Sequence, residues 1–202
     1  MSDTSSTHVY PYAQTSGRTV SRKLLTQHGK AFWFTGLSAS GKTTIAHHIA
    51  KLLLEQDLVV KVLDGDHLRA GINSDLGFSE KDRYENIRRA AEVSKMFVQT
   101  GIITLNCFIT PTNALRHLAR SIIGSDDYFE IFVNATTEIC GQRDPKGLYQ
   151  KARSGALSDF PGVNAPFETP CAANFTVDTS QTEIGVSVGQ VMNFLLPLVR
   201  IK

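Results

Sequence analysis

A glycine-rich segment, Gly36 to Thr43, constrains the fold of this chain more than any other part of the sequence. It reads Gly-Leu-Ser-Ala-Ser-Gly-Lys-Thr and matches the pattern G-x-x-x-x-G-K-[ST] in full. The short apolar run before it, Ala31 to Thr35, is typical of a buried strand. The apolar residues after it recur at the spacing of one helix face: Ile45, Ala46, Ile49, Ala50 and Leu53. The segment therefore joins a strand to a helix, which is the context that the motif requires.

The chemistry of this phosphate loop favours a nucleoside triphosphate as the ligand. Its glycines let backbone N–H groups converge on phosphate oxygens, and the N-terminus of the following helix adds a partial positive charge. We expect Lys42 to reach the β- and γ-phosphates and Thr43 to bind Mg²⁺. The alternative is a plain glycine turn between a strand and a helix, and the lysine, the threonine and both flanking elements speak against it.

Further apolar runs alternate with helical stripes along the rest of the chain. The runs that read as strands are Leu58–Leu63, Ile102–Ile109, Tyr128–Val133 and Phe175–Val177. The helical stripes consist of Ile87, Ala90, Ala91, Phe97 and Val98, and of Ile184, Val188, Val191, Met192 and Leu195. We therefore predict an α/β fold, a three-layer sandwich of the P-loop NTPase type with a mainly parallel sheet of about five strands. Ligands in such sheets bind beyond the carboxyl ends of the strands.

The length of 202 residues fits one domain. Residues 1–28 are polar and lack periodicity, so we expect an N-terminal arm, followed by the domain with the phosphate loop over residues 29–202. Within the domain, residues of about 143–168 are basic and contain several glycines. They suit a lid that closes over phosphates, although a solvated helix and loop would have the same composition.

Charge and hydropathy exclude several classes of function. The formal net charge of +2 is too weak for an electrostatic footprint on nucleic acid or on an anionic membrane. No apolar stretch approaches the roughly 20 residues that span a bilayer. The first residues carry neither a basic start nor an apolar run, so we expect no secretory signal and a cytoplasmic protein.

Two carboxylates, Asp64 and Asp66, follow the second predicted strand. At that edge of the sheet they lie beside the phosphate loop, where a carboxylate holds magnesium or accepts a proton from an attacking hydroxyl. An ordinary Asp-Gly turn is the alternative interpretation, and the intact phosphate loop beside it makes this alternative less favoured. We assign Asp64 to the metal together with Thr43.

Ser79 and Asp82 form a capping box that starts a helix toward Thr100. On this helix Arg83 and Asn86 extend the apolar stripe inward. Because burial of an unpaired guanidinium is prohibitive, either a carboxylate meets Arg83 or this face opens into an anion site.

Two other features flank that helix face. Phe78 precedes the cap and would be an odd exposed aromatic unless a ligand stacks on it, with core packing as the alternative. Four charged residues have the i+3 and i+4 spacing of a solvated, salt-bridged face, to which we assign no chemistry: Glu85, Arg88, Arg89 and Glu92.

Several of these segments together resemble the adenylylsulfate kinase family. The resemblance covers roughly residues 20–200 and rests on Phe34–Thr44, Asp64–Asp66, Gly71–Ser79, Asp82–Arg89, Phe108–Pro111 and Arg143–Tyr149. That family transfers the γ-phosphoryl group of ATP to the 3′-hydroxyl of adenosine 5′-phosphosulfate (APS), which gives 3′-phosphoadenylyl sulfate (PAPS) and ADP. The resemblance implies a homodimer that uses ATP and Mg²⁺ in sulfate assimilation.

The resemblance also implies roles for single residues. ATP would contact Gly36, Leu37, Ser38, Ala39, Ser40, Gly41, Lys42, Thr43 and Thr44, with Arg143 beside its base. APS would be lined by Asp66, Arg69, Phe78, Arg83, Asn86, Ile109, Lys146 and Phe160, and the rings of Phe78 and Phe160 would sandwich its adenine. Asp66 would orient or deprotonate the 3′-hydroxyl, although a loose transition state asks little of a base and leaves open which aspartate serves. Lys42 would offset charge as the phosphoryl group moves.

Thr110 stands where the family commonly has a serine. It follows the predicted strand Ile102–Ile109 at the carboxyl edge of the sheet, so we expect it to bind or position the acceptor without forming a phosphoenzyme.

Two other functions remain as alternatives. One is a kinase of the same architecture that phosphorylates a sugar or a shikimate-like acceptor, which an aromatic clamp suits poorly. The other is a regulatory domain that binds APS or PAPS without turnover. Such a domain would be free to lose Lys42, Thr43, Asp64 and Asp66, all of which this chain retains.

Overall fold

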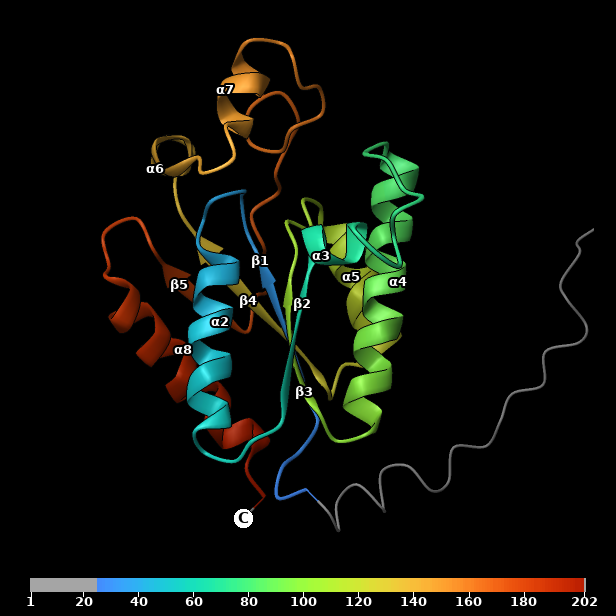
Figure 1. Ribbon diagram of the computed structural model, residues 1–202, viewed down its shortest axis with the longest axis vertical. Coiled ribbons are helices and arrows are strands. Elements are labelled where there is room, and N and C mark those ends of the chain that lie inside the picture. Colours follow the sequence, from blue (N-terminus) through green and yellow to red (C-terminus); the bar gives the residue numbers. More distant parts are fainter. Residues whose placement is uncertain (1–24, 202) are drawn as a thin grey trace, which may run out of the picture.

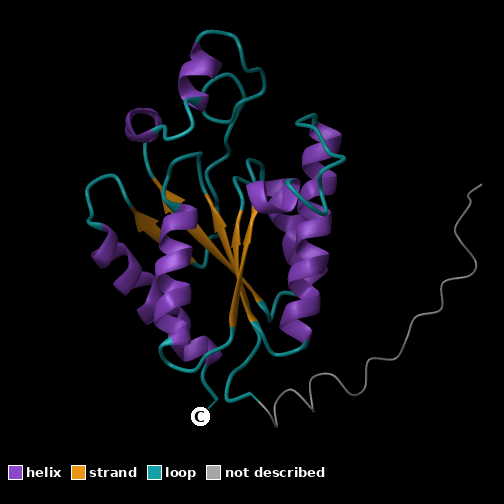
Figure 2. Cartoon of the chain, in the orientation of Figure 1, coloured by secondary structure: helices purple, strands orange, loops and turns teal. Residues whose placement is uncertain are grey.

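A five-stranded sheet forms the centre of the protein in the computed structural model, which describes residues 25–201 (Figures 1 and 2). Its strands are β1 (Ala31–Thr35), β2 (Val60–Asp64), β3 (Ile103–Cys107), β4 (Tyr128–Asn134) and β5 (Phe175–Asp178). Their spatial order is β2-β3-β1-β4-β5, and every pairing is parallel. Each strand lies on one of the predicted apolar runs, and the predicted fold class is confirmed.

Helices cover both faces of this sheet (Figure 2). On one face Phe32 and Phe34 of β1 pack with α2 (Lys42–Leu54) and α8 (Ile184–Val199). On the other face Ala31 and Trp33 pack with α4 (Glu80–Gln99) and α5 (Asn113–Ile123). Because successive side chains of a strand alternate between the two faces, the whole of β1 is buried, which explains its continuous apolar sequence.

Local capping determines where two of the long helices, α4 and α5, begin. Ser79 accepts a hydrogen bond from the backbone N–H of Asp82, so α4 starts at the predicted capping box. Helix α5 is absent from the sequence-based assignment, although Thr112 caps it by accepting from the N–H of Leu115. Leu115, Leu118, Ala119, Ile122 and Ile123 recur at the spacing of one helix face, so the sequence carried the signal and the assignment overlooked it.

Three short helices lie near the carboxyl edge of the sheet: α3 (Gly65–Arg69), α6 (Thr137–Arg143) and α7 (Leu148–Arg153). Helices α6 and α7 stand beyond the strand ends (Figure 1). A separate apolar cluster joins α7 and Phe160 to Leu37 of the phosphate loop. Gly162 has a φ of +87° and packs so closely on Leu37 that a Cβ atom would lie 2.6 Å from its Cδ2. The segment predicted as a lid thus contacts the phosphate loop, and its closure stays a prediction.

Of the predicted N-terminal arm, residues 1–24 lie outside the described residues. Gln27, near the end of the predicted arm of residues 1–28, packs with the domain, because its side chain donates hydrogen bonds to two separate segments. Its Nε2 donates to the carbonyls of Val59 and Gly101, both at 2.8 Å. Between residues 25 and 201, no helix is long and apolar enough to cross a membrane.

Candidate active site

A pocket of about 560 Å³ lies at the carboxyl edge of the sheet. The phosphate loop, the ends of β2 and β3, helix α4 and the segment after α6 all contribute to its walls. The predicted site residues that line it are Ser38, Ala39, Gly41, Lys42, Thr43, Thr44, Asp64, Asp66, Arg69, Phe78, Arg83, Asn86, Ile109, Thr110, Lys146 and Phe160. Four other predicted residues do not border this volume: Gly36, Leu37, Ser40 and Arg143. The structure therefore brings all the predicted acceptor residues and most of the predicted nucleotide residues to one cavity.

The phosphate loop uses two of its backbone N–H groups, those of Gly36 and Ser40, in hydrogen bonds to carbonyls and leaves others for an anion. Gly36 has a φ of +150°, and a Cβ atom there would lie 2.4 Å from the carbonyl oxygen of Val133, so no side chain fits. Helix α2 begins at Lys42 with no side-chain cap from any described residue. Its first N–H groups and the positive end of its dipole therefore face the pocket without a competing partner.

Lys42 is buried at the floor of this loop. Its Nζ donates to the carbonyl oxygens of Gly36 at 2.9 Å and Leu37 at 2.6 Å. Burial disfavours the charged form and lowers the pKa of Lys42 to about 8. The side chain is thus a poorly hydrated cation, directed at the same volume as the free amides.

Asp64 and Thr43 meet at the end of β2. The Thr43 hydroxyl donates to Asp64 Oδ2 at 2.6 Å, and Asp64 Oδ1 accepts from the backbone N–H of Asp66 at 2.9 Å. Asp64 therefore caps α3, as in an ordinary Asp-Gly turn, and also faces the phosphate loop as predicted. Asp66 is exposed and forms an ion pair with Lys146, which reaches over from the segment between α6 and α7.

The pair of Thr43 and Asp64 fits a magnesium ion. A hydroxyl and a carboxylate are the hard oxygen ligands that Mg²⁺ takes in proteins, usually together with phosphate oxygens and water. Among residues 25–201 no group of three or more His, Cys, Asp or Glu side chains is arranged to hold a metal without other ligands. Phosphate oxygens would complete the shell.

Arg83 bears on the two alternatives left open by the sequence, a carboxylate partner and an anion site, and its role in an anion site stays a prediction. Its Nε donates to the carbonyl of Phe78 at 2.9 Å and its Nη2 to the carbonyl of Asp159 at 2.6 Å, so its hydrogen bonds go to backbone oxygens. The half-buried guanidinium borders the pocket, which is the arrangement expected of an anion site. Arg83 also ties the start of α4 to the segment after α7.

The two predicted aromatic residues differ in exposure. Phe78 is 59% exposed, so the alternative of core packing is wrong, and the guanidinium of Arg69 lies 4.4 Å from its ring centroid. Phe160 is only 6% exposed and packs edge-on against Tyr149 with ring centroids 5.0 Å apart. Both rings border the same pocket, and the stacking of adenine between them stays a prediction.

Arg143 lies behind the phosphate loop rather than in the main pocket. Its Nη1 donates to the hydroxyl of Thr179 at 3.1 Å, and its Nη2 to the carbonyl of the same residue. The Thr179 hydroxyl in turn donates to the carbonyl of Ser40 at 2.8 Å. Sequence reasoning missed Thr179, because only the end of β5 brings it to the loop and no motif marks it.

Thr110 has a strained backbone conformation in the loop that follows β3. Its φ is +45°, which is unusual for a β-branched residue and also for a residue before proline. Two buried groups hold it there. The indole N–H of Trp33 donates to its hydroxyl oxygen at 2.9 Å, and Arg116 Nη1 donates to its carbonyl at 2.7 Å. Such strain persists at functional sites when the surroundings enforce it.

Replacement of Thr110 by alanine is expected to leave measurable turnover, reduced by about 3- to 30-fold, because one neutral hydrogen bond of about 1–2 kcal/mol is lost. The Thr110→Ser variant keeps the hydroxyl that Trp33 binds and should retain turnover close to that of the unmutated protein. Steady-state rates with saturating ATP measure both. Abolished activity in Thr110→Ala, with radiolabel from γ-labelled ATP trapped on Thr110 of the unmutated protein, would instead demonstrate a covalent intermediate.

Comparison with known proteins identifies relatives of this chain. A family model described as adenylylsulphate kinase matches residues 28–178. The adenylyl-sulfate kinase of Bacteroides thetaiotaomicron is 47% identical over 196 residues, which are 96% of this chain and 98% of the relative. The likeness therefore extends over almost the whole length of both chains.

Solved structures agree in fold. The APS kinase of Mycobacterium tuberculosis, solved in complex with AMPPNP and APS, is 40% identical, with a TM-score of 0.80 over 83% of this chain and 98% of that chain. A hexameric APS kinase from Thiobacillus denitrificans is 28% identical with a TM-score of 0.62, over 84% of this chain and 29% of that longer chain. The first of these was solved with two ligands bound at once.

Proposed function

The chain belongs to the adenylylsulfate kinase family, and we propose that the pocket at the carboxyl edge of its sheet performs the family reaction with the residues described above. It is an ATP-dependent phosphotransferase that acts on an alcohol, and the acceptor is the 3′-hydroxyl of APS. The products are PAPS and ADP. One observation carries the assignment of the site: the phosphate loop and the inward face of α4 open onto the same cavity.

The nucleotide half of the site consists of the loop from Gly36 to Thr44. Its amides and the N-terminus of α2 bind the β- and γ-phosphates, and Lys42 exchanges the loop carbonyls for phosphate oxygens when ATP enters. A poorly hydrated ammonium gives up little water in this exchange, which favours its contact with phosphate. Arg143, fixed by Thr179 behind the loop, lies beside the ATP base.

Thr43 and Asp64 hold Mg²⁺ in this proposal, and the ion, when bound, neutralises charge on the β- and γ-phosphates. Asp64 already contacts the Thr43 hydroxyl and the amide of Asp66. We therefore assign to Asp66 the orientation or deprotonation of the 3′-hydroxyl. As that oxygen bonds to the γ-phosphorus, the bond to the β-γ bridging oxygen breaks, and the hydroxyl proton passes to a carboxylate.

The acceptor half of the site combines cations with aromatic rings. Arg69, Arg83 and Lys146 offer positive charge to the phosphosulfate, and Phe78 with Phe160 flanks the adenine. Asn86, Ile109 and Thr110 complete this wall. A sugar acid or shikimate has no aromatic base to stack on these rings, which argues against the sugar and shikimate alternatives.

A coupled assay tests the proposal. Purified protein with ATP and Mg²⁺ should convert APS to PAPS, and it should release little ADP when APS is omitted or replaced by gluconate or shikimate. Chromatographic detection of PAPS together with ADP provides the measurement. A protein that binds both ATP and APS but forms no PAPS would instead act as a regulatory domain.

Quaternary state and location stay predictions. We expect a homodimer, which light scattering on the purified chain measures directly. We also expect the enzyme to work in the cytoplasm, with its PAPS supplied either to reduction or to sulfonation.

A further inference from the structure

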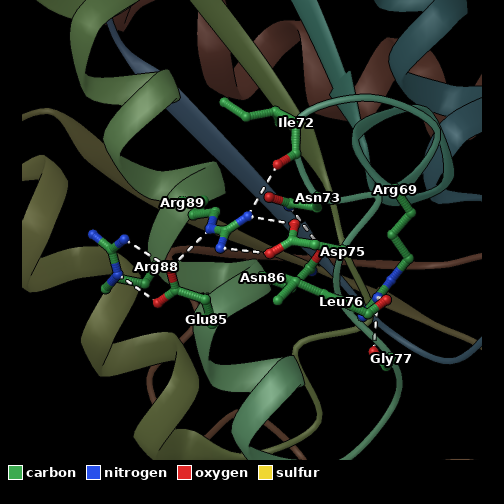
Figure 3. A network of polar contacts seen from close by, with 10 residues as sticks. All are labelled: Arg69, Ile72, Asn73, Asp75, Leu76, Gly77, Glu85, Asn86, Arg88 and Arg89. Carbon is green, nitrogen blue, oxygen red and sulfur yellow. Dashed lines mark hydrogen bonds and ion pairs between the residues drawn. The ribbon is translucent and has the colours of Figure 1, made fainter.

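Arginines from both flanking helices hold the segment between α3 and α4, residues 70–79 (Figure 3). Arg69 Nη1 donates to the carbonyls of Leu76 at 3.0 Å and Gly77 at 2.8 Å. Arg89 Nη1 donates to the carbonyl of Ile72 at 3.0 Å. Such a segment lacks the backbone pairing of a helix or strand, so these arginines satisfy carbonyls that would otherwise need water.

Arg89 has a larger role than the solvated face predicted for it. Its guanidinium forms a bidentate pair with Asp75, at 2.7 and 2.9 Å, and its Nε donates to Glu85 Oε1 at 2.8 Å (Figure 3). Glu85 also accepts from Arg88, and these hydrogen bonds from Arg88 and Arg89 lower the pKa of Glu85 to about 2. The planar, two-point contact fixes the segment against α4 in one register.

Asn73 belongs to the segment that these arginines hold, and it is fully buried, with an exposed fraction of 0%. Its backbone N–H donates to the carbonyl of Leu68 at 2.8 Å, and its carbonyl accepts from Leu76. Its side-chain Nδ2 donates to Oδ1 of Asn86 at 3.0 Å, which Figure 3 shows as a contact from the segment to α4. Asn86 borders the pocket, whereas Asn73 does not.

The direction of this hydrogen bond determines what Asn86 presents to a ligand. A carboxamide has an oxygen that accepts and a nitrogen that donates, so a bond to Oδ1 leaves Nδ2 for another partner. In the reverse arrangement Asn73 would be left with a buried amino group without a partner. An orphaned N–H is rarer in proteins than the under-satisfied oxygen that Asn73 has among the described residues.

We propose that Asn73 is a positioning residue, which holds the amide of Asn86 with its N–H donors toward the acceptor in the pocket. The proposal rests on the proposed function, because the acceptor it concerns is APS. An amide held in this way donates to oxygen atoms of the ligand and does not repel them. Asn73 thereby contributes to the selection of an oxygen-rich anion that it does not touch.

The test is the Asn73→Asp substitution, which should reverse the orientation of the Asn86 side-chain amide. A carboxylate offers only acceptors, so Asn86 would turn Nδ2 toward it and Oδ1 toward the ligand. The KM for APS and the dissociation constant for APS, measured by calorimetry at pH 8, should rise about 5- to 20-fold while the KM for ATP stays unchanged. The matched control is Ser74→Asp, which adds the same charge at the exposed neighbouring position and should leave APS binding within about twofold.

A second variant of Asn73 and a double-mutant cycle with Asn86 separate an effect on the orientation of Asn86 from a loss of protein stability. Asn73→Leu has similar size without a donor, so it frees the Asn86 amide to rotate and should weaken APS by a smaller factor than Asn73→Asp. In an Asn86→Ala background both substitutions should have no further effect on APS. Thermal melts show whether each variant folds, and Asn73→Leu carries the test if Asn73→Asp does not.

Several results would overturn the inference. These are unchanged APS binding in both folded variants, equal weakening of ATP and APS, and a full additional loss in the Asn86→Ala background. Failure of the proposed function has a different signature, because the unmutated protein would then form no PAPS. Calorimetry with APS alone still tests the role of Asn73 in that case.

Discussion

Lys42→Ala should lower kcat for PAPS formation by on the order of 10²-fold or more. Lys42 points from the base of the phosphate loop, where Gly36 and Leu37 hold its ammonium until a phosphate replaces their carbonyls. Its contact tightens as charge develops on the transferred phosphoryl group, and a water molecule in its place would carry no positive charge. The rate should therefore fall more than the affinity for ATP. Steady-state kinetics with ATP varied at saturating APS separate the two effects.

The control for Lys42 is Lys51→Ala on the same helix. Lys51 is exposed, and its only ion pair in the described part of the chain is a 3.9 Å contact with Glu55, so its loss should leave kcat nearly unchanged. Circular dichroism should show that both variants fold. Normal turnover in a folded Lys42→Ala protein would contradict the assignment of the phosphate loop.

Arg83→Ala should lower the affinity for APS by about one to two decades and the affinity for ATP far less. The loss of a charge-assisted contact accounts for ~1.5–3 kcal/mol. The structure adds a second reason, because Arg83 donates to the carbonyls of Phe78 and Asp159 and so links two walls of the pocket. Without it, the walls that carry the two aromatic rings lose their common anchor. Calorimetric titration with each ligand separately measures the difference.

Arg88→Ala is the matched control for Arg83. Arg88 lies five residues further along the same helix and pairs with Glu85 outside the pocket. Its removal should change APS binding by less than about twofold, since a partly exposed i,i+3 ion pair contributes little. If Arg83→Ala weakened ATP and APS by the same factor, Arg83 would be a structural residue rather than an acceptor ligand.

Local patterns predicted the elements whose residues depend on their immediate neighbours. The motif from Gly36 to Thr43 implied a strand before it and a helix after it, and β1 and α2 occupy those places. The capping box at Ser79 marked the start of α4 correctly. In these cases hydrogen bonding and periodicity within a few residues determine the structure, so the sequence carries the signal directly.

Contacts between distant segments were beyond the reach of those patterns. The spacing on α4 indicated that Arg83 faces inward, but not that its partners would be backbone carbonyls at Phe78 and Asp159. The donation from Asn73 to Asn86 likewise depends on how an irregular segment folds back on a helix. Nothing in residue type distinguishes such an asparagine from one in a solvated turn, so only the three-dimensional structure identifies it.

The hydrogen bond between Trp33 and Thr110 also gives the protein a built-in optical probe. The chain contains a single tryptophan, so its intrinsic indole emission comes from one position. That indole is fully buried in β1 and stacks on Phe108 with ring centroids 5.0 Å apart. It donates its N–H to Thr110, which lies in the loop after β3 and borders the pocket. Fluorescence of the unlabelled protein therefore reports from the wall of the pocket, without a dye that would disturb it.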